Sequence, residues 1–352
     1  MSKTIITGGA GFIGSNAASR YLQRGHHVVV VDNLWRDGVR KNLEWLRPQG
    51  LLTFVPLDIR QGDELAELFR EHRDADQVLH LAAQVAVTTS VTSPREDFEI
   101  NACGTFNVLE AMRLSAMTAP ILYSSTNKVY GEMTDITAVE RNGRYSYQSL
   151  PLGVPEERNL DFHSPYGCSK GAADQYVIDY HRIYGLRTIV FRQSCIYGYR
   201  QFGAEDQGWI AWFMIASQLG SPITVYGDGK QVRDVLFIDD LLDAYDAAFA
   251  AGERVLGRAY NIGGGPNNVL SLRELLAYIE KRQKTKLPYK LADWRPGDQK
   301  AFISDIRRAQ ADLKWSPKIS CERGMDLLYD WVAANLDLFA KPTPSLQPVS
   351  TN

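Results

Sequence analysis

The segment Thr7-Gly-Gly-Ala-Gly-Phe-Ile-Gly14 joins a short β-branched run, Thr4 to Thr7, to a helical pattern, and its glycines have the spacing GxxGxxG. Glycine allows the backbone to turn tightly and to approach a pyrophosphate, while the start of a helix offers N–H groups to phosphate oxygens. A strand, a glycine-rich turn and a helix in this order therefore predict a dinucleotide-binding site. We assign to this site Gly8, Gly11, Phe12, Ile13 and Gly14.

The second predicted strand ends at Asp32, close to the position at which dinucleotide-binding folds place an acidic residue for the adenosine ribose. A carboxylate there repels a 2′-phosphate, so NAD is expected as the cofactor rather than NADP. Asp58 and Ile59, after the third strand, are expected to border the adenine. The other positions assigned to the cofactor are Asn33, Leu81, Ala82, Ala83 and Asn101.

Short β-branched runs alternate with longer helical patterns over the first 190 or so residues. This alternation predicts βαβ units and hence an α/β fold with a Rossmann-type doubly wound parallel sheet. The predicted strands are Thr4 to Thr7, His27 to Val31, Leu52 to Val55, Gln77 to Leu81, Ile121 to Ser124 and Thr188 to Arg192.

After Arg192 the alternation becomes irregular, which indicates a smaller, mainly C-terminal substrate lobe. The stretch 134–161 is rich in Pro, Gly, Arg and Asn without a clear period, and we expect a functional or disordered loop there. The expected division is a NAD-binding domain of residues 1–192 and 235–262, a substrate lobe of residues 193–234 and 263–340, and a polar tail of residues 341–352.

The composition, with 45% hydrophobic and 23% charged residues, is that of an ordinary globular protein. A formal net charge of -2 gives no general attraction for nucleic acid or an anionic membrane. The sequence has neither a signal-peptide pattern nor an apolar run of about 18 residues, so a cytoplasmic protein is expected. The scattered cysteines, without CxxC spacing, predict reduced thiols and no metal site: Cys103, Cys168, Cys195 and Cys321.

The pentapeptide Tyr166-Gly-Cys-Ser-Lys170 follows Pro165 at the start of a helical pattern, and its i,i+4 spacing puts both side chains on one helix face. A phenol has a pKa near 10. To act as a base near pH 7, its pKa must fall by about 3 units, which corresponds to a free energy of about 4 kcal/mol. An ammonium about 4 Å away, at an effective dielectric of about 20, supplies energy of this order. The pair is therefore a candidate catalytic pair, with a solvated helix face as the alternative.

The stretch Tyr123-Ser-Ser-Thr-Asn-Lys-Val-Tyr-Gly131, together with GxxGxxG and YxxxK, resembles the extended short-chain dehydrogenase/reductases that modify nucleotide sugars. The resemblance implies that Thr126 completes a triad and hydrogen-bonds the reacting sugar oxygen. It implies that Tyr166 removes the hydroxyl proton. Lys170 would hold the nicotinamide ribose and lower the pKa of Tyr166, and the hydride would pass to NAD.

Family members that are 4,6-dehydratases carry Asp-Glu after this Thr, because the elimination of water requires an additional acid and base. Here the two positions are Asn127 and Lys128, so the ketosugar has no obvious elimination route. The simplest outcome is that the hydride returns to the sugar. If it returns to the opposite face, the carbon is inverted, so the sequence predicts an epimerase. The cofactor is regenerated in each turnover and is expected to stay tightly bound.

The strings DNLWRDG, HLAAQVAVTTS and DFHSPYGCSKGAADQY resemble most the branch that inverts nucleotide-linked hexoses at C2. The alternatives are a 4-epimerase and a non-catalytic nucleotide-sensing protein.

By resemblance, Arg233 and Arg295 contact the diphosphate of the nucleotide sugar, and Arg200 and Gln201 belong to a YGPRQ-like turn. The turn departs from the family pattern, with Cys195 before it and Tyr199 in place of Pro. The family also implies a homodimer or homotetramer through the predicted helices Phe98 to Ser115 and Gly167 to Tyr184. The remaining substrate-binding candidates are Thr88, Asn127, His163 and Asp298, beside Thr126 itself.

Overall fold

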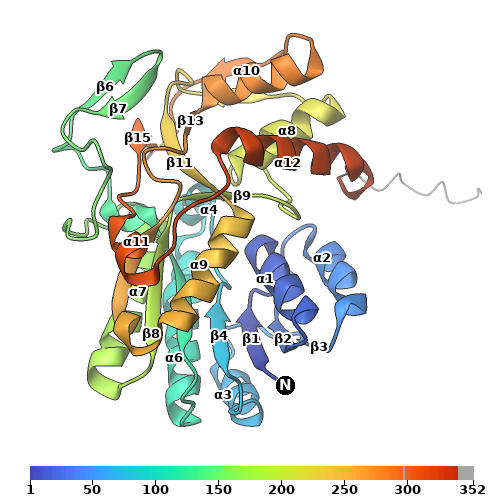
Figure 1. Cartoon of the computed structure of the whole chain (residues 1–352), viewed down its shortest axis with the longest axis vertical. Helices are drawn as coiled ribbons and strands as arrows, with labels where there is room; N and C mark the ends of the chain where they lie inside the picture. Colours follow the sequence, from blue (N-terminus) through green and yellow to red (C-terminus); the bar gives the residue numbers. More distant parts are fainter. Residues whose placement is uncertain (296–297, 340–352) are drawn as a thin grey trace, which may run out of the picture.

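The computed structural model describes residues 1–295 and 298–339. Its centre is a seven-stranded sheet with the strand order β12-β8-β5-β4-β1-β2-β3, in which every neighbouring pair is parallel (Figure 1). The predicted doubly wound parallel sheet is therefore confirmed. The strands are β1 (Lys3–Thr7), β2 (His27–Val31), β3 (Leu52–Val55), β4 (Gln77–His80), β5 (Ile121–Thr126), β8 (Thr188–Gln193) and β12 (Arg258–Ile262).

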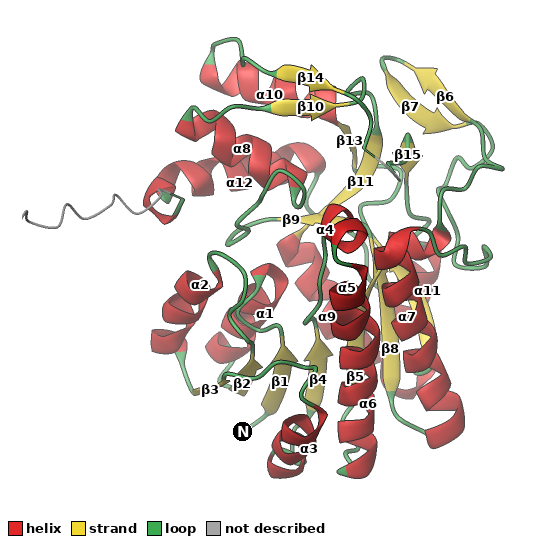
Figure 2. Cartoon of the chain, turned by 180° about the vertical axis from the view of Figure 1, so that it is seen from behind, coloured by secondary structure: helices red, strands yellow, loops and turns green. Residues whose placement is uncertain are grey.

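Helices cover both faces of this sheet, as the valine run of β2 requires. Val28 and Val30 belong to the core on one face, whereas Val29 and Val31 belong to the core on the other, because successive strand residues point in opposite directions. Figure 1 shows the first face and Figure 2 the second. The first is covered by α1 (Phe12–Gln23), α2 (Val39–Leu46) and α9 (Ile238–Ala251), and the second by α3 (Gly62–Glu71), α6 (Gly104–Leu114) and α7 (Ser164–Tyr184).

The helix predicted from Phe98 to Ser115 is not uniform. It is preceded by α4 (Val87–Thr92) and α5 (Pro94–Phe98), and residues Glu99–Cys103 form a π-helical turn before α6 begins. A widened turn of this kind inserts one residue into the helical repeat and is frequent at functional sites. Here it contains the buried Asn101.

The second lobe lies at the carboxyl edge of the sheet (Figure 1). The segment α11 (Arg307–Leu313) packs on β12 and α9 of the large domain, although the division expected from the sequence assigned it to the lobe. The lobe strands are β9 (Cys195–Tyr197), β10 (Thr224–Tyr226), β11 (Val232–Phe237), β13 (Val269–Ser271), β14 (Lys290–Ala292) and β15 (Ala301–Phe302), and its helices are α8 (Trp209–Leu219), α10 (Leu272–Gln283) and α12 (Cys321–Ala334). Short 3₁₀ turns are Arg47–Gln49, Asn127–Tyr130, Gly252–Val255 and Leu336–Leu338.

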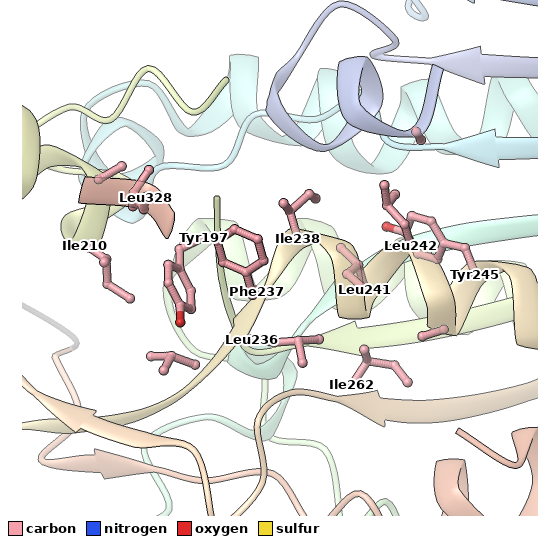
Figure 3. Packing of buried hydrophobic residues seen from close by; sticks show 14 of the residues in the cluster. Tyr197, Ile210, Leu236, Phe237, Ile238, Leu241, Leu242, Tyr245, Ile262 and Leu328 are labelled. Carbon is pink, nitrogen blue, oxygen red and sulfur yellow. The ribbon is translucent and has the colours of Figure 1, made fainter. Parts of the chain in front are cut away.

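A continuous apolar core joins the lobe to the large domain (Figure 3). Only Ser194 separates β8 from β9, and β11 runs directly into α9. At this junction the Tyr197 and Phe237 rings meet edge to face with centroids 5.4 Å apart. Ile210 of α8 and Leu328 of α12 extend the same cluster, so the two parts share one core.

Residues 138–147 correct the expected loop at 134–161, because they form a β-hairpin of β6 (Ala138–Arg141) and β7 (Arg144–Tyr147). Its turn residues Asn142 and Gly143 have φ values of 52° and 79°, as a type I′ turn requires. The hairpin is tied to the lobe: the Tyr145 hydroxyl donates to Asp228 at 2.7 Å.

Candidate active site

The three predicted catalytic residues meet at the carboxyl edge of the central sheet. Thr126 is the last residue of β5, and Tyr166 and Lys170 lie one turn apart at the start of α7. The Thr126 hydroxyl acts on the Tyr166 phenol and lowers its pKa, and the Lys128 backbone N–H donates to Thr126 Oγ1 at 3.3 Å. The side chains of Thr126, Tyr166 and Lys170 are all buried. The fold thus brings together residues 40 or so positions apart in the chain, as the family pattern implies.

The electrostatics of this trio differ from the expectation that Lys170 lowers the pKa of Tyr166. Burial raises the pKa of Tyr166 to about 12, and the groups that oppose this rise are the Thr126 hydroxyl and the Arg36 guanidinium. Lys170 Nζ donates to the Ser124 carbonyl at 2.6 Å, and burial lowers the pKa of Lys170 to about 7. A lysine that is itself so readily deprotonated is a weak source of positive charge for the phenol.

The glycine-rich turn is packed so closely that residues with a Cβ atom could not replace Gly8 or Gly14. A Cβ atom on Gly14 would lie 2.1 Å from the Gly8 carbonyl oxygen, and one on Gly8 would lie 2.6 Å from the Ala82 nitrogen. Gly8 also has a φ of 69°, which favours glycine. The turn therefore needs glycine at these positions in order to pack against itself and against Ala82, and it leads directly into the first N–H groups of α1, the kind of position at which phosphate groups bind.

Asp32 directly follows β2 and lies beside the same turn. Its Oδ2 accepts from the Ala10 backbone N–H at 3.1 Å and its Oδ1 from Leu34 at 2.8 Å, while burial raises its pKa. These bonds hold the carboxylate at the edge of the turn, where a ribose hydroxyl is expected. The close glycine packing and the acidic strand end both fit NAD.

The other predicted cofactor residues lie around this edge. Asn33 Nδ2 donates to Asp58 at 2.8 Å, and the hydrogen bonds from Arg60 lower the pKa of Asp58 to about 2. Asn101 Nδ2 donates to the Gln84 carbonyl at 3.0 Å and to Ser169 Oγ at 3.1 Å, so it ties the loop after β4 to α7. Ile59 is buried, and the part-buried residues of the group are Phe12, Ile13, Leu81, Ala82 and Ala83.

A narrow cavity opens at the 3₁₀ turn that follows Thr126. It contains the predicted residue His163, whose Nε2 lies 2.9 Å from a Glu132 carboxylate oxygen. Lys128 Nζ donates to Gln299 Oε1 at 3.4 Å across the same cavity. Asn127 is buried beside Thr126, with 3.4 Å between Thr126 Oγ1 and Asn127 Oδ1. The cavity is lined by Val87, Lys128, Gly131, Glu132, His163, Ser164 and Gln299.

The diphosphate candidate Arg233 and the substrate candidate Asp298 lie next to Gln299 of this cavity. Arg233 donates to the Gln299 carbonyl at 2.8 Å and to Asp298 at 2.8 Å, so both residues lie directly behind Gln299. Arg295 lies farther out, with its guanidinium 3.8 Å from the centroid of the Tyr226 ring. These arginines stay predictions as phosphate ligands.

The structure does not bring every substrate candidate to the cavity. The Arg200 guanidinium lies 4.2 Å from the centroid of the Trp45 ring, and it therefore points to α2 rather than to the cavity. Gln201 is buried and its Nε2 donates to the Ile196 carbonyl at 3.4 Å. Thr88 lies within α4, where its hydroxyl donates to Asp206 at 2.9 Å, so it does not cap that helix.

Sequence reasoning missed Arg36, Glu132 and Gln299. Arg36 comes four residues after Asp32, and its charge acts on the Tyr166 phenol. Glu132 directly follows the VYG motif, so its position was a usable signal. No signal in the sequence marks Gln299, because only the folding of the C-terminal part brings this residue close to Lys128 and Gly131 after β5.

Comparison with known proteins leads to the same family. Residues 4–263 match the model of the NAD dependent epimerase/dehydratase family. The chain is 45% identical over 337 residues to the CDP-paratose 2-epimerase of Salmonella typhi, which covers 94% of this chain and 99% of that protein. It is 32% identical to dTDP-glucose 4,6-dehydratase 1 of Escherichia coli (strain K12), over 95% of this chain and 93% of that protein.

Solved structures show the same similarity. The UDP-glucose 4-epimerase of Thermotoga maritima, solved with UDP-glucose, has a TM-score of 0.81 and 30% identity and covers 95% of this chain and 99% of its own. The Thermus thermophilus UDP-glucose 4-epimerase in complex with NAD has a TM-score of 0.79 and 31% identity, with coverage of 95% and 99%. The sequence match, the fold and the Thr126–Tyr166–Lys170 arrangement agree: the chain belongs to the NAD dependent epimerase/dehydratase family.

Proposed function

We propose that this chain is an isomerase that inverts a nucleotide-linked hexose at C2, with a CDP-paratose/CDP-tyvelose type of substrate and CDP- or GDP-linked glucose or mannose as related ones. The observation that carries the proposal is the Thr126–Tyr166 hydroxyl pair followed by Asn127 and Lys128 in place of a second acid and base. The 45% identity to the CDP-paratose 2-epimerase of Salmonella typhi supports the C2 position.

In this mechanism Thr126 and Tyr166 hold the sugar hydroxyl between them, and the phenol takes its proton. Lys170, on the next turn of α7, would hold the nicotinamide ribose of bound NAD. NAD, when bound, supplies the redox chemistry by accepting the hydrogen of the sugar carbon with its electron pair and giving it back. The ketosugar turns over before Tyr166 returns the proton, so the same residues serve both faces of the sugar.

A 4-epimerase is the second candidate, because the Thermotoga maritima UDP-glucose 4-epimerase has the TM-score of 0.81. The hydroxyl–Tyr–Lys chemistry suits either carbon. A nucleotide-sensing protein without turnover is a weaker candidate, since it would have no use for the buried Thr126, Tyr166 and Lys170 together.

Incubation of the NAD-loaded protein with CDP-paratose is expected to yield the C2-inverted sugar, identified by the NMR coupling constants of the ring protons. Parallel reactions with CDP-glucose, GDP-glucose and UDP-glucose test the range of substrates. Inversion at C4 alone would establish the second candidate instead.

No 4-keto-6-deoxy product is expected in these reactions, and the inverted carbon is expected to carry no deuterium when the reaction runs in D₂O. The reason is that the hydrogen travels to the cofactor and back without exchanging with solvent. Mass spectrometry of the product measures both results. Solvent deuterium at C2 would indicate proton abstraction from carbon and would contradict the mechanism.

We also propose a homodimer, or a homotetramer built from it, that pairs through α6 and α7. These helices lie side by side on the face shown in Figure 2 and expose large apolar side chains. A free apolar face of this kind marks a protein interface. The exposed residues of α6 and α7 are Phe106, Leu114, Tyr176, Ile183 and Tyr184, and Phe98 at the end of α5 is exposed as well.

Phe106→Glu is expected to convert the dimer into monomers, because a buried interface cannot accommodate an unpaired carboxylate. Light scattering after gel filtration measures the mass. Leu51→Glu is the matched control, since Leu51 is also exposed but lies outside this face. A mass that is identical for the parent protein and the Phe106 variant would rule out this surface.

No helix in the described part of the chain has the length and apolar composition that a membrane span needs. The four cysteines are free thiols. We propose a cytoplasmic location on the ground that a reducing compartment maintains such thiols.

A further inference from the structure

Asp97 is a buried carboxylate that takes no part in the proposed transfer of the proton and the hydride. It lies in α5, is 1% exposed and accepts hydrogen bonds from three uncharged side chains. Gln84 Nε2 and Asn101 Nδ2 donate to Oδ1 at 2.8 and 3.1 Å, and the Ser169 hydroxyl donates to Oδ2 at 2.5 Å. Burial raises the pKa of Asp97, whereas the Ser169 and Gln84 donors and the Lys170 ammonium lower it. The three donors thus stabilise an ionised carboxylate without neutralising its charge.

The donors connect Asp97 to the turn of α7 that carries the catalytic side chains. Ser169 lies between Tyr166 and Lys170 in the sequence, and its hydroxyl oxygen is 3.2 Å from the Tyr166 carbonyl oxygen. Gln84 belongs to the loop after β4 and directly follows residues assigned to the cofactor. One carboxylate therefore holds the catalytic turn against the loop that is expected to border the cofactor.

The ammonium of Lys170 lies next to this network and contacts uncharged groups. Its Nζ donates to the Ser124 carbonyl at 2.6 Å and lies 4.2 Å from the centroid of the Tyr123 ring. Burial lowers the pKa of Lys170 to about 7, and the charges of Asp174 and Asp97 oppose this fall. The negative charge that balances the ammonium therefore comes from these two carboxylates.

The two carboxylates differ in how their own charge is compensated. Asp174 forms an ion pair with Arg192 at 2.9 Å, so the guanidinium offsets its charge. The donors to Asp97 are neutral, so its charge acts on Lys170 without an opposing cation of its own. Of the two, Asp97 is the carboxylate whose charge no bonded guanidinium offsets.

The remaining titratable groups around the catalytic turn do not replace Asp97. Those that face the ammonium from β4 and β5 are His80 and Tyr123, which are neutral near pH 7 because burial lowers the pKa of the imidazole to about 3 and raises that of the phenol. Two charges of opposite sign act on the Tyr166 phenol, since Asp97 raises its pKa and Arg36 lowers it. Within the described chain, Asp97 is therefore the carboxylate whose charge acts on both catalytic groups.

We propose that Asp97 is a positioning residue, which fixes the catalytic turn of α7 through Ser169 and supplies an uncompensated negative charge that keeps Lys170 an ammonium during turnover. This inference rests on the proposed roles of Tyr166 and Lys170, and it holds for inversion at either carbon. Without the charge of Asp97 both groups release their protons at lower pH, because a nearby carboxylate favours the protonated form of each. Both limbs of the pH–rate profile are therefore expected to move in the same direction, to lower pH.

The test compares Asp97→Asn with the parent protein, both in the full-length, NAD-loaded form. Asparagine preserves the shape of the side chain and removes its charge. The pH dependence of kcat/KM, measured with a sugar nucleotide that the parent protein inverts, is expected to move to lower pH by about one unit. NMR titration of ¹³C-labelled lysine side chains, with Lys170→Met to identify the signal, should show the same fall in the pKa of Lys170 without any turnover.

Asp97→Glu and Asp240→Asn are the matched controls. Asp97→Glu retains the charge and should give the pH profile of the parent protein even where turnover falls. Asp240 is also 1% exposed and accepts from the Lys318 and Ile319 backbone N–H groups at 3.0 and 2.9 Å, but it lies in α9 on the other face of the sheet. Its asparagine variant is therefore expected to lose stability and to leave the pH profile unchanged.

Should Asp97→Asn be too unstable to assay, Asp97→Ser removes the same charge and is expected to give the same displacement. Reduced turnover with unmoved limbs and an unchanged Lys170 titration would overturn the proposal, since Asp97 would then serve only to pack α5 on α7. A lower Lys170 pKa in a protein that inverts no sugar nucleotide would establish the effect of the charge and refute the proposed function instead.

Discussion

Tyr166→Phe is expected to lower kcat about 10³-fold, since removal of a general acid–base typically removes a factor of this order. The change deletes the phenolic oxygen on which the Thr126 hydroxyl acts and leaves the ring in its buried site. The glycine turn and Asp32 are untouched, so the NAD content of the purified protein should stay the same. Product formation followed by NMR and NAD released by denaturation measure the two effects.

Tyr289→Phe is the matched control for this experiment. It removes a phenolic oxygen at an exposed position outside both the candidate site and the proposed dimer face, so turnover should be unchanged. A Tyr166 variant with the activity of the parent protein would exclude Tyr166 from proton transfer. A variant that also loses NAD would show that the phenol mainly supports the cofactor.

Asp174→Ala is expected to lower the free energy of unfolding by about 3–5 kcal/mol, which is the range for breaking one half of a buried ion pair. Asp174 accepts from Arg192 Nη2 at 2.9 Å and from Arg192 Nε at 3.0 Å. Ser125 also donates to this carboxylate, at 2.7 Å. The side chains of Asp174 and Arg192 are 0% and 5% exposed, so the variant leaves a guanidinium buried without its counter-charge. Chemical denaturation followed by fluorescence measures the loss.

The surface pair Arg24–Asp246 is the control, because Arg24 is 49% exposed and its loss should change the free energy of unfolding by less than about 1 kcal/mol. The network around Arg192 also reaches the catalytic edge, since Arg192 Nη1 donates to the Tyr130 hydroxyl at 3.2 Å. A stability loss as small as that of the Arg24 variant would mean that water reaches the buried pair.

The parts of the site that the sequence predicts are those with a local geometric cause. The spacing of Gly8, Gly11 and Gly14 reflects a single tight turn, and the spacing of Tyr166 and Lys170 reflects one turn of helix. Both patterns can be read without knowing the rest of the fold. The hairpin turn at Asn142-Gly143 has an equally local signal, yet the charged residues on either side hid the alternation of its strands.

Features that depend on tertiary packing could not be predicted from the local sequence. The direction of the Lys170 ammonium depends on the Ser124 carbonyl of a neighbouring strand. Arg200 lies on the Trp45 ring because α2 and the turn after β9 meet only in the folded chain. The π-helical turn around Asn101 is likewise invisible to a helical period, which continues on both sides of it.

The junction at Ser194, where β8 passes into β9, and the direct passage of β11 into α9 have a further consequence. A hinge needs a few loosely held backbone positions, and here the crossings are buried in shared apolar packing (Figure 3). The lobe and the sheet are therefore expected to move as one unit. In that case the oxidised sugar has to turn about the single bonds of its own phosphate tether, without help from a movement between the two parts of the protein.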